Sequence, residues 1–262
     1  MVTWQNLAEF EHAVPKIYSI SPAAWALVAG DALAAARITA GAAAKVAGIA
    51  GPVHEIAAVV AQQYHDVRMA AAEAQFLLPR GLTLATYYSK HQQLLSQITE
   101  NLDQSLASFD PEVELIVAGV DGTGGHLFTV DNPGGPPQCH DVIGVVAIGS
   151  GEIHAVQSMI GFGHAAMQPV KDTVFRVFAS KRRAELAPGV GRETDLMILR
   201  PGGAVRLPDK ALATLSELYE SYAASVVASA QEQVSGWVLD LAGESTGTAA
   251  AGGPARRSLN RR

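Results

Sequence analysis

Two apolar runs bounded by turn residues most constrain how this chain folds. Residues 25–29 (WALVA) follow Ser21-Pro22, and residues 113–120 (VELIVAGV) precede the Gly-Thr-Gly-Gly sequence at 122–125. Short, nearly continuous apolar runs between turn residues are typical of well-buried strands. The turn at Ser21-Pro22 predicts a hairpin of residues 17–20 and 25–29. The glycine-rich turn predicts a second hairpin of residues 113–120 and 126–131.

Helical periodicity fills most of the remaining chain. Residues 31–47 are rich in alanine and lack proline, so they predict a helix that ends at the Gly-rich break 48–52. A second helix carries Ile56, Val60 and Tyr64 on one stripe, and Thr83 is placed to cap a third that runs to residue 102. We also predict a strand over 142–148, helices over 152–166, 170–186 and 208–234, and a hairpin of 194–199 and 203–207.

Runs of strands alternate with runs of helices, which favours antiparallel sheets covered by helices over a βαβ arrangement. The sequence therefore predicts an α+β fold. We assign residues 1–240 to one domain, because neither a linker nor an internal repeat interrupts them. Residues 241–262 are rich in Ala, Gly, Thr, Ser and Arg without an apolar pattern, so we predict a disordered tail there.

Composition excludes several classes of partner. The formal net charge is −6, which gives no general attraction to nucleic acid. Charged residues interrupt the alanine-rich stretch 23–50 before it becomes long enough to span a bilayer, and no secretory signal is visible. Cys139 is the only cysteine, which suits a reducing compartment. We therefore expect a soluble cytoplasmic protein with no membrane and no nucleic-acid partner.

Four short blocks occur in an order and at spacings that are specific in combination. They are residues 16–22 (KIYSISP), 27–31 (LVAGD), 115–121 (LIVAGVD) and 147–151 (AIGSG). Together they resemble the body of a proteasome β-type subunit of bacterial kind, an N-terminal-nucleophile (Ntn) hydrolase. The resemblance covers roughly residues 3–200. It implies an αββα sandwich, in which helices flank two antiparallel sheets.

The resemblance also implies a threonine-type peptidase. In that family an N-terminal Thr attacks the peptide carbonyl, and its own α-amine accepts the hydroxyl proton. Lys16 precedes Gly30 by fourteen residues, which matches the family's interval between the catalytic Lys and the oxyanion-hole glycine. Ser150 corresponds to the serine that helps to relay the proton. Val28 and Ala32 would line the pocket for the residue before the cleaved bond.

Each of these residues also has a structural interpretation. Lys16 would otherwise be a solvated strand charge, Gly30 a tight strand end, and Ser150 the cap of a helix that begins near residue 152. Glu185 aligns with the family's second acid and Pro188 with its partner serine. Both depart from the family's Asp and Ser, so Glu185 is either a catalytic acid or a surface charge.

The resemblance implies neither a metal nor an organic cofactor. The histidines are not spaced as a metal set, and Cys139-His140-Asp141 would point to alternate sides of a strand. The implied substrate is a peptide or an unfolded protein. The implied assembly is a homo-oligomeric ring whose sites face an inner chamber.

The family's nucleophile strand, and a short strand ending in Asp, come before its catalytic Lys. Only fifteen residues precede Lys16, and Thr3 lies too close to be the nucleophile. Thr3 fits instead the Thr that the family has four residues after that Asp. We therefore expect a chain shortened at its N-terminus, without its first strands and inactive as given. The alternative is a non-catalytic, proteasome-like structural or interaction subunit.

Overall fold

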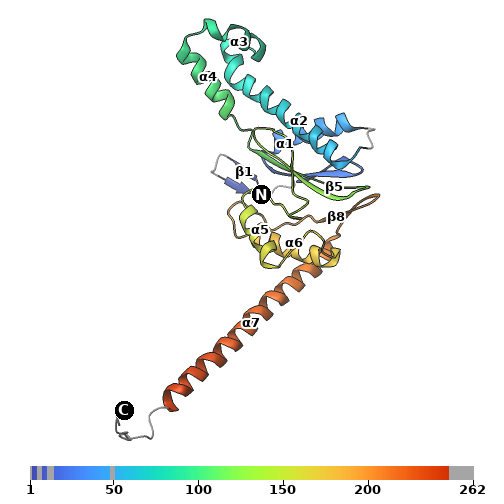
Figure 1. Ribbon diagram of the computed structural model, residues 1–262, viewed down its shortest axis with the longest axis vertical. Helices are drawn as coiled ribbons and strands as arrows, with labels where there is room; N and C mark the ends of the chain where they lie inside the picture. The colour runs from blue at the N-terminus through green and yellow to red at the C-terminus, as the bar shows by residue number, and fades with distance from the viewer. Residues whose placement is uncertain (1, 5–7, 11–14, 48–50, 248–262) are drawn as a thin grey trace, which may run out of the picture. The chain divides into compact units, whose positions relative to one another are not determined.

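A five-stranded antiparallel sheet forms the centre of the first unit (Figure 1). The computed structural model describes residues 2–4, 8–10, 15–47 and 51–247. The chain divides into two compact units, Met1–Leu212 and Ala213–Arg262. The sheet order is β3-β4-β5-β6-β7. These strands are β3 (Ile17–Ser21), β4 (Ala24–Gly30), β5 (Val113–Asp121), β6 (Gly124–Val130) and β7 (Gln138–Cys139).

Both predicted hairpins of this sheet are confirmed. β3 pairs with β4 through Ile17↔Leu27, and β5 pairs with β6 through Val117↔Phe128. β4 lies between β3 and β5, with Ala26 opposite Val117. The central position of β4 and β5 explains why their sequences are nearly continuous apolar runs. The prediction of a mixed α+β protein with an antiparallel sheet is therefore confirmed.

Two helices, α1 (Ala32–Val46) and α2 (Val53–Ala72), cover one face of the sheet (Figure 1). Alternate strand residues point at them, because successive side chains of a strand face opposite ways. The resulting core combines side chains from both helices and from the strands. Its fully buried members include Ala26, Leu115, Val117, Ile38, Ile56, Val60 and Tyr64.

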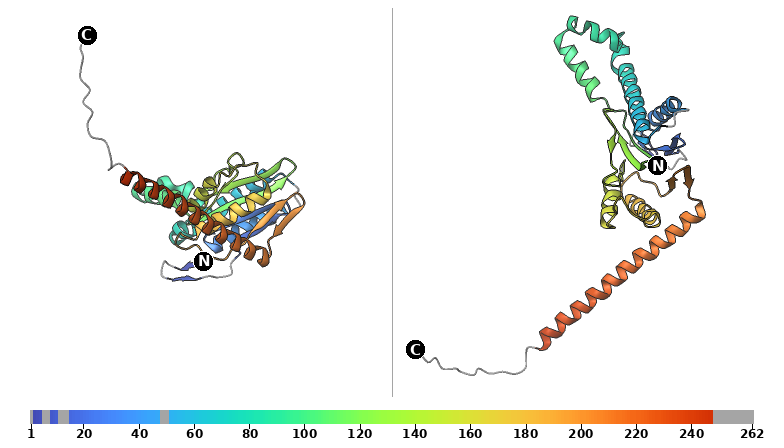
Figure 2. Two further views of the ribbon diagram at one scale, coloured as in Figure 1. Left: turned by 90° about the horizontal axis from the view of Figure 1, so that it is seen from below. Right: turned by 45° about the vertical axis from the view of Figure 1, so that its right-hand side comes forward.

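Beyond α2 the chain turns back as a helical hairpin (Figure 2). A π-helical turn (Glu73–Leu77) and a 3-10 turn (Leu78–Arg80) end at Gly81, whose φ of 69° is left-handed. Thr83 caps α3 (Leu84–Lys90) in a capping box with Thr86, which confirms its expected role. The predicted single helix to residue 102 is wrong, because a 3-10 turn (His91–Gln93) separates α3 from α4 (Ser96–Ser108).

Arg68 of α2 joins this helical hairpin to the sheet. Its side chain is 5% exposed. The guanidinium donates to Leu106 O, Ala107 O and Phe109 O at the end of α4, and to Asn132 Oδ1 after β6, at 2.9–3.1 Å. A cation at a helix C-terminus satisfies carbonyls that lack intrahelical partners. Arg68 therefore fixes the chain on both sides of the β5–β6 hairpin.

Helices α5 (Glu152–Gly161) and α6 (Val170–Ala184) pair on the side of the sheet away from α1 and α2 (Figure 1). Two short hairpins complete this unit. The first pairs β1 (Val2–Trp4), which contains Thr3, with β2 (Ala8–Phe10). The second pairs β8 (Met197–Arg200) with β9 (Gly203–Arg206). The predictions of two helices and a hairpin in the second half of this unit are confirmed.

The predicted strand at 142–148 is wrong. These residues have no regular structure, and β7 ends at Cys139. A strand must pair with a neighbour to satisfy its backbone, and an apolar run cannot supply that partner itself. Among the described residues the only sheet of more than two strands is therefore the one that contains β3–β7.

The second unit is built on α7 (Asp209–Gly247), which is longer than the predicted helix over 208–234. Residues 241–247, assigned to the tail, are helical, and residues 248–262 lie outside the described residues. Leu218, Tyr222 and Val226 have the spacing of one helix face, and they are 53%, 41% and 49% exposed. The apolar stripe exists in the sequence, but it is not buried in a core.

Candidate functional site

Gly30 and Ser150 lie at the same pocket, although 120 positions separate them in the sequence. The pocket has a volume of about 370 Å³. It lies at the end of β4, beside the start of β5 and the turn that precedes α5. Its lining residues are Ala29, Gly30, Asp110, Glu112, Val113, Glu114, Asp131, Asn132, Gly149 and Ser150.

Gly30 has a backbone conformation that other residues rarely adopt. Its φ is +91°, and a Cβ added there would lie 1.8 Å from the carbonyl oxygen of Glu112. Glu112 itself has a φ of 55°, and its carbonyl accepts a hydrogen bond from Asp31 N at 2.8 Å. The chain can therefore leave β4 and enter α1 at this point only because residue 30 lacks a side chain.

The N–H of Gly30 is not used in the β4–β5 ladder. Val28 N donates to Lys16 O on the β3 side at 2.9 Å, whereas Asp31 N donates to Glu112 O on the β5 side. Successive N–H groups of a strand point to opposite neighbours. By this alternation the Gly30 N–H lies on the β3 side, beyond the described part of that neighbouring strand. A backbone donor in this position is suited to a developing oxyanion.

Glu114 fixes the turn that contains Ser150. Its side chain lies on the face of β5 away from α1, and its Oε2 accepts a hydrogen bond from Gly149 N at 2.7 Å. Gly149 has a φ of +81°, and an added Cβ would lie 3.1 Å from the Ala29 side chain. The turn thus rests on Ala29 and Glu114, which are paired on β4 and β5. The Ser150 side chain is exposed, and the N-cap of α5 is Gly151, without a side-chain cap.

Lys16, Val28 and Ala32 do not line this pocket. Lys16 is exposed, and its backbone pairs with Val28, two residues or roughly 7 Å along the strand from Gly30. The Val28 side chain belongs to the core beneath α1, and Ala32 is half-buried at the first position of α1. Lys16 and Val28 lie on the same face of the sheet, because they are opposite each other in the ladder.

Glu185 lies directly after α6, close to the Ser150 turn but in a different set of contacts. A Cβ added to Gly151 would lie 2.8 Å from the side chain of Ala184, the residue before Glu185. The Glu185 carboxylate itself forms ion pairs with Lys181 at 2.7 Å and Arg182 at 3.1 Å. Pro188 is exposed in the loop that follows. Glu185 therefore balances two cations of its own helix.

The pocket is acidic. Asp110, Glu112, Glu114 and Asp131 line it, and none of these four carboxylates forms an ion pair with a described residue. The described lining residues include no lysine, histidine or cysteine. The pocket thus offers a backbone donor, a serine hydroxyl and negative charge. It could hold an oxyanion at Gly30 and relay a proton through Ser150, but its described lining offers no amine or imidazole as a nitrogen base.

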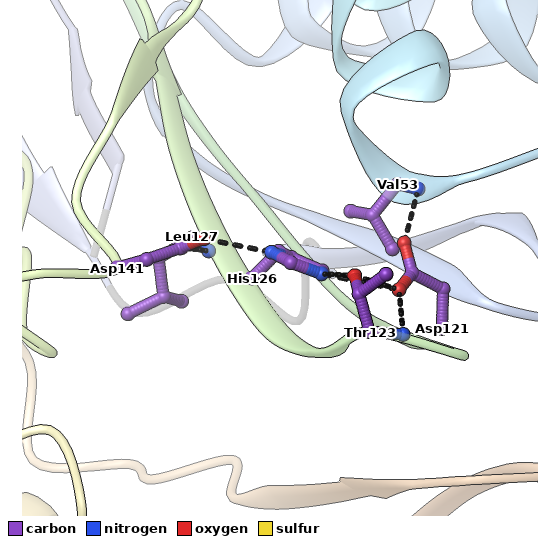
Figure 3. Close-up of polar contacts among 6 residues, drawn as sticks. All are labelled: Val53, Asp121, Thr123, His126, Leu127 and Asp141. Carbon is purple, nitrogen blue, oxygen red and sulfur yellow. Dashed lines mark hydrogen bonds and ion pairs between the residues drawn. The ribbon is translucent and has the colours of Figure 1, made fainter.

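A second polar cluster lies at the tip of the β5–β6 hairpin (Figure 3). His126 stands between two aspartates: its Nδ1 is 2.7 Å from Asp141 Oδ2, and its Nε2 is 3.1 Å from Asp121 Oδ1. Thr123 donates its hydroxyl to Asp121 Oδ1 at 2.6 Å and lies 2.8 Å from His126 Nε2. We call Asp121, Thr123, His126 and Asp141 the His126 clamp.

The second carboxylate oxygen of each aspartate in the clamp also accepts a hydrogen bond (Figure 3). Asp121 Oδ2 accepts from Val53 N, the first residue of α2, at 2.9 Å, and Asp141 Oδ1 accepts from Leu127 N at 2.8 Å. Hydrogen bonds to Asp141 and Asp121 raise the pKa of His126. Hydrogen bonds from Thr123 and Val53 hold the pKa of Asp121 well below its usual range, and backbone and His126 bonds lower that of Asp141 despite its burial.

Thr123, His126 and Asp141 have the distances of a hydroxyl–imidazole–carboxylate triad, but the hydrogen bonds argue against that chemistry. Carboxylate oxygens only accept, so both His126 nitrogens that face them carry hydrogen. The Thr123 proton goes to Asp121, and His126 has no free lone pair to accept it. The clamp is therefore a charged connection between segments rather than a nucleophile and its base.

Comparison with known proteins finds no matching family model and no matching curated protein. Within the described part of the chain, no group of three or more His, Cys, Asp or Glu side chains is arranged to hold a metal ion. None of the described helices is long and apolar enough to cross a membrane.

Sequence reasoning missed Glu114 and the His126 clamp. Glu114 is a charged residue inside an otherwise apolar run, which is a signal that its side chain has a polar partner. Asp121 and Thr123 flank a glycine turn, where such residues commonly hydrogen-bond locally. Nothing in the local sequence, however, connects His126 with Asp141, fifteen residues later.

Proposed function

We propose that this chain is a proteasome-like subunit of the threonine-type peptidases, and that peptide bonds are hydrolysed at the Gly30–Ser150 pocket. The observation that carries the proposal is the convergence of these two residues on one pocket. Both were selected from short sequence blocks that lie far apart in the chain. The proposed substrate is a peptide or unfolded protein, and the proposed assembly is a cytoplasmic homo-oligomeric ring.

The proposed reaction needs a hydroxyl nucleophile with an adjacent amine. The hydroxyl oxygen adds to the peptide carbonyl carbon, and its proton passes to the amine. The Gly30 N–H donates to the resulting oxyanion, and the Ser150 hydroxyl relays the proton to the leaving amine as the C–N bond breaks. Water then hydrolyses the ester by the same route. Lys16 contributes positive charge near the nucleophile.

The finer fold, an αββα sandwich, belongs to the same proposal. In its favour, α1 and α2 cover one face of the five-stranded sheet, and α5 and α6 lie on the other side, as two outer layers would. The apolar residues 142–148 would form part of a second sheet once neighbouring strands were present to pair with them.

The test compares turnover of fluorogenic peptides by two proteins. One is the 262-residue chain, and the other carries any residues that are encoded in frame upstream of Met1. Because the reaction needs a hydroxyl with an adjacent amine, we expect turnover only by a protein that supplies both. In the extended protein, Lys16→Ala should lower kcat by about a hundredfold, the usual scale for a positioned catalytic group. Lys171→Ala, an exposed lysine on α6, is the matched control.

Two results would remove the peptidase proposal. One is a stop codon immediately upstream of Met1 and in frame with it. The other is an extended, folded protein whose acylation rate is the same with Lys16 and with alanine at that position.

The second candidate function is a non-catalytic, proteasome-like structural or interaction subunit. It is favoured by the positions of Lys16, which is outside the pocket lining, and of Glu185, which is paired with Lys181 and Arg182. Exposed apolar side chains on and after α5 also suit a surface for assembly. They are Ile153, Ile160, Met167 and Val170, each more than 60% exposed. Ring formation by an extended protein without turnover would support this function.

A further inference from the structure

We propose that the His126 clamp is a pH-dependent latch, which holds the irregular segment 140–149 against the sheet when His126 is charged and loosens it when His126 is neutral. The latch itself does not depend on the proposed peptidase activity. Its consequence for Ser150, the residue immediately after this segment, does rest on that function.

The clamp ties three separate parts of the chain together (Figure 3). Asp121 ends β5 and also accepts from Val53 N at the start of α2. His126 belongs to β6, and Asp141 opens the segment that follows β7. The ring joins Asp121 to Asp141, so its protonation state affects all three parts together.

The segment has few other attachments. His140 N donates to Leu127 O at 2.8 Å, and His140 Nε2 lies 3.0 Å from Thr129 Oγ1. His164 Nε2 lies 3.0 Å from Gly144 O, and Gly149 N is held by Glu114. Residues 142–148 form no strand, and Val142 and Ile143 are 96% and 61% exposed. A segment with few buried contacts and few backbone partners opens more easily than a strand.

The charges that face His126 all favour its charged form. Asp121 approaches from β5 and Asp141 from the segment after β7, and the start of α2 contributes the hydrogen bond from Val53 N to Asp121. Cys139, at the end of β7, contributes to lowering the pKa of Asp141. Phe128, beside His126 on β6, is uncharged. As pH rises, His126 loses one N–H, so one carboxylate then faces a nitrogen lone pair and the other keeps only a neutral donor.

The size of the effect follows from hydrogen-bond strength. Hydrogen bonds from a charged donor are roughly twice as strong as neutral ones. We therefore expect the segment to open about fivefold more often when His126 is neutral. The direction follows from the raised pKa of His126: the latch is fully formed below the ordinary histidine pKa of about 6.5 and is lost as pH rises through the raised value.

The experiment measures two properties of the 262-residue chain from about pH 5 to about pH 9, a range that spans the ordinary histidine pKa. NMR follows the titration of His126. Hydrogen exchange, corrected for its intrinsic pH dependence, follows the amides of Ile143 and Gly144, which donate to His140 O at 3.0 and 2.8 Å. We expect their protection to fall about fivefold as His126 loses its proton.

Variants separate the effect of His126 from that of other titrating groups. His126→Asn keeps a neutral donor toward Asp141, so protection should be low and independent of pH. His126→Leu should lower the protection of these amides further. His154 is exposed on α5, so His154→Asn should behave as the unmodified chain. If His126→Leu does not fold, His126→Asn still gives the answer. Protection that stays constant while His126 titrates, or a pH dependence that survives in His126→Asn, would overturn the latch.

Discussion

Replacing Gly30 with alanine tests whether the pocket is built on the close approach of two backbone segments. An alanine Cβ at this position would lie 1.8 Å from the Glu112 carbonyl oxygen, where real Cβ contacts are not shorter than 3.0 Å. The neighbouring atom belongs to the backbone, so no side-chain rotation can relieve the overlap. The end of β4 and the residue before β5 must separate by roughly 1 Å or more.

The magnitude has three parts. A φ of +91° costs a non-glycine residue about 1–2 kcal/mol. Overpacking that moves backbone costs about 1–3 kcal/mol. Separation of the two segments also breaks the Asp31 N–Glu112 O hydrogen bond, worth about 1 kcal/mol. We therefore expect Gly30→Ala to lower the free energy of unfolding by about 3–6 kcal/mol.

The assay is urea unfolding followed by circular dichroism, with Gly202→Ala as the matched control. Gly202, between β8 and β9, has a similar φ of +87°, but an added Cβ there meets nothing within 4 Å. For the control, the free energy of unfolding should fall only by the conformational cost of a positive φ, about 1–2 kcal/mol. The difference between the two variants measures the close approach at Gly30. Equal losses in both would refute the reasoning.

Three further predictions concern the rest of the first unit. Arg68→Met should lower the free energy of unfolding by about 3 kcal/mol. The cost of leaving its carbonyl partners without a donor exceeds the gain from no longer burying a cation. A loss below about 1 kcal/mol in urea unfolding would contradict this. Thr83→Ala should weaken the start of α3 by about 1 kcal/mol, and unchanged hydrogen exchange of the α3 amides would count against the capping box. The His126 clamp should stabilise the fold most at mildly acidic pH. Its histidine, with a raised pKa, loses its contribution as pH rises through that value. Its two aspartates, with lowered pKa values, lose theirs as pH falls below the ordinary value of 3.8 and through the folded values. Thermal unfolding across pH checks this: the clamp variant His126→Leu should show a flatter profile.

The local elements were predictable because their causes are local. The steps of four between Ile56, Val60 and Tyr64 indicated α2, and all three side chains are buried. Thr83 has the hydroxyl and the position that a helix cap requires, and it caps α3. The turns at Ser21-Pro22 and 122–125 define two hairpins whose registers follow from their lengths.

Features that depend on a distant partner were not predictable. The run 142–148 has the composition of a strand, but its conformation depends on whether another strand is available to pair with it. The apolar stripe of α7 has helical spacing, but burial requires a surface that the stripe itself does not encode. The break between α3 and α4 also lies inside a continuous periodic pattern.

For the candidate site, the sequence by itself singled out Gly30 and Ser150 only through the resemblance that their short sequence blocks carry. Only the tertiary structure placed them at one pocket, and it did so through the β4–β5 register and the Glu114–Gly149 hydrogen bond. It also decided that His126 lies between Asp121 and Asp141, since a hairpin and a return of the chain after β7 bring the three together. The chemistry of a side chain depends on the identity of one residue, whereas the proximity of distant residues depends on the packing and strand pairing of the whole sheet.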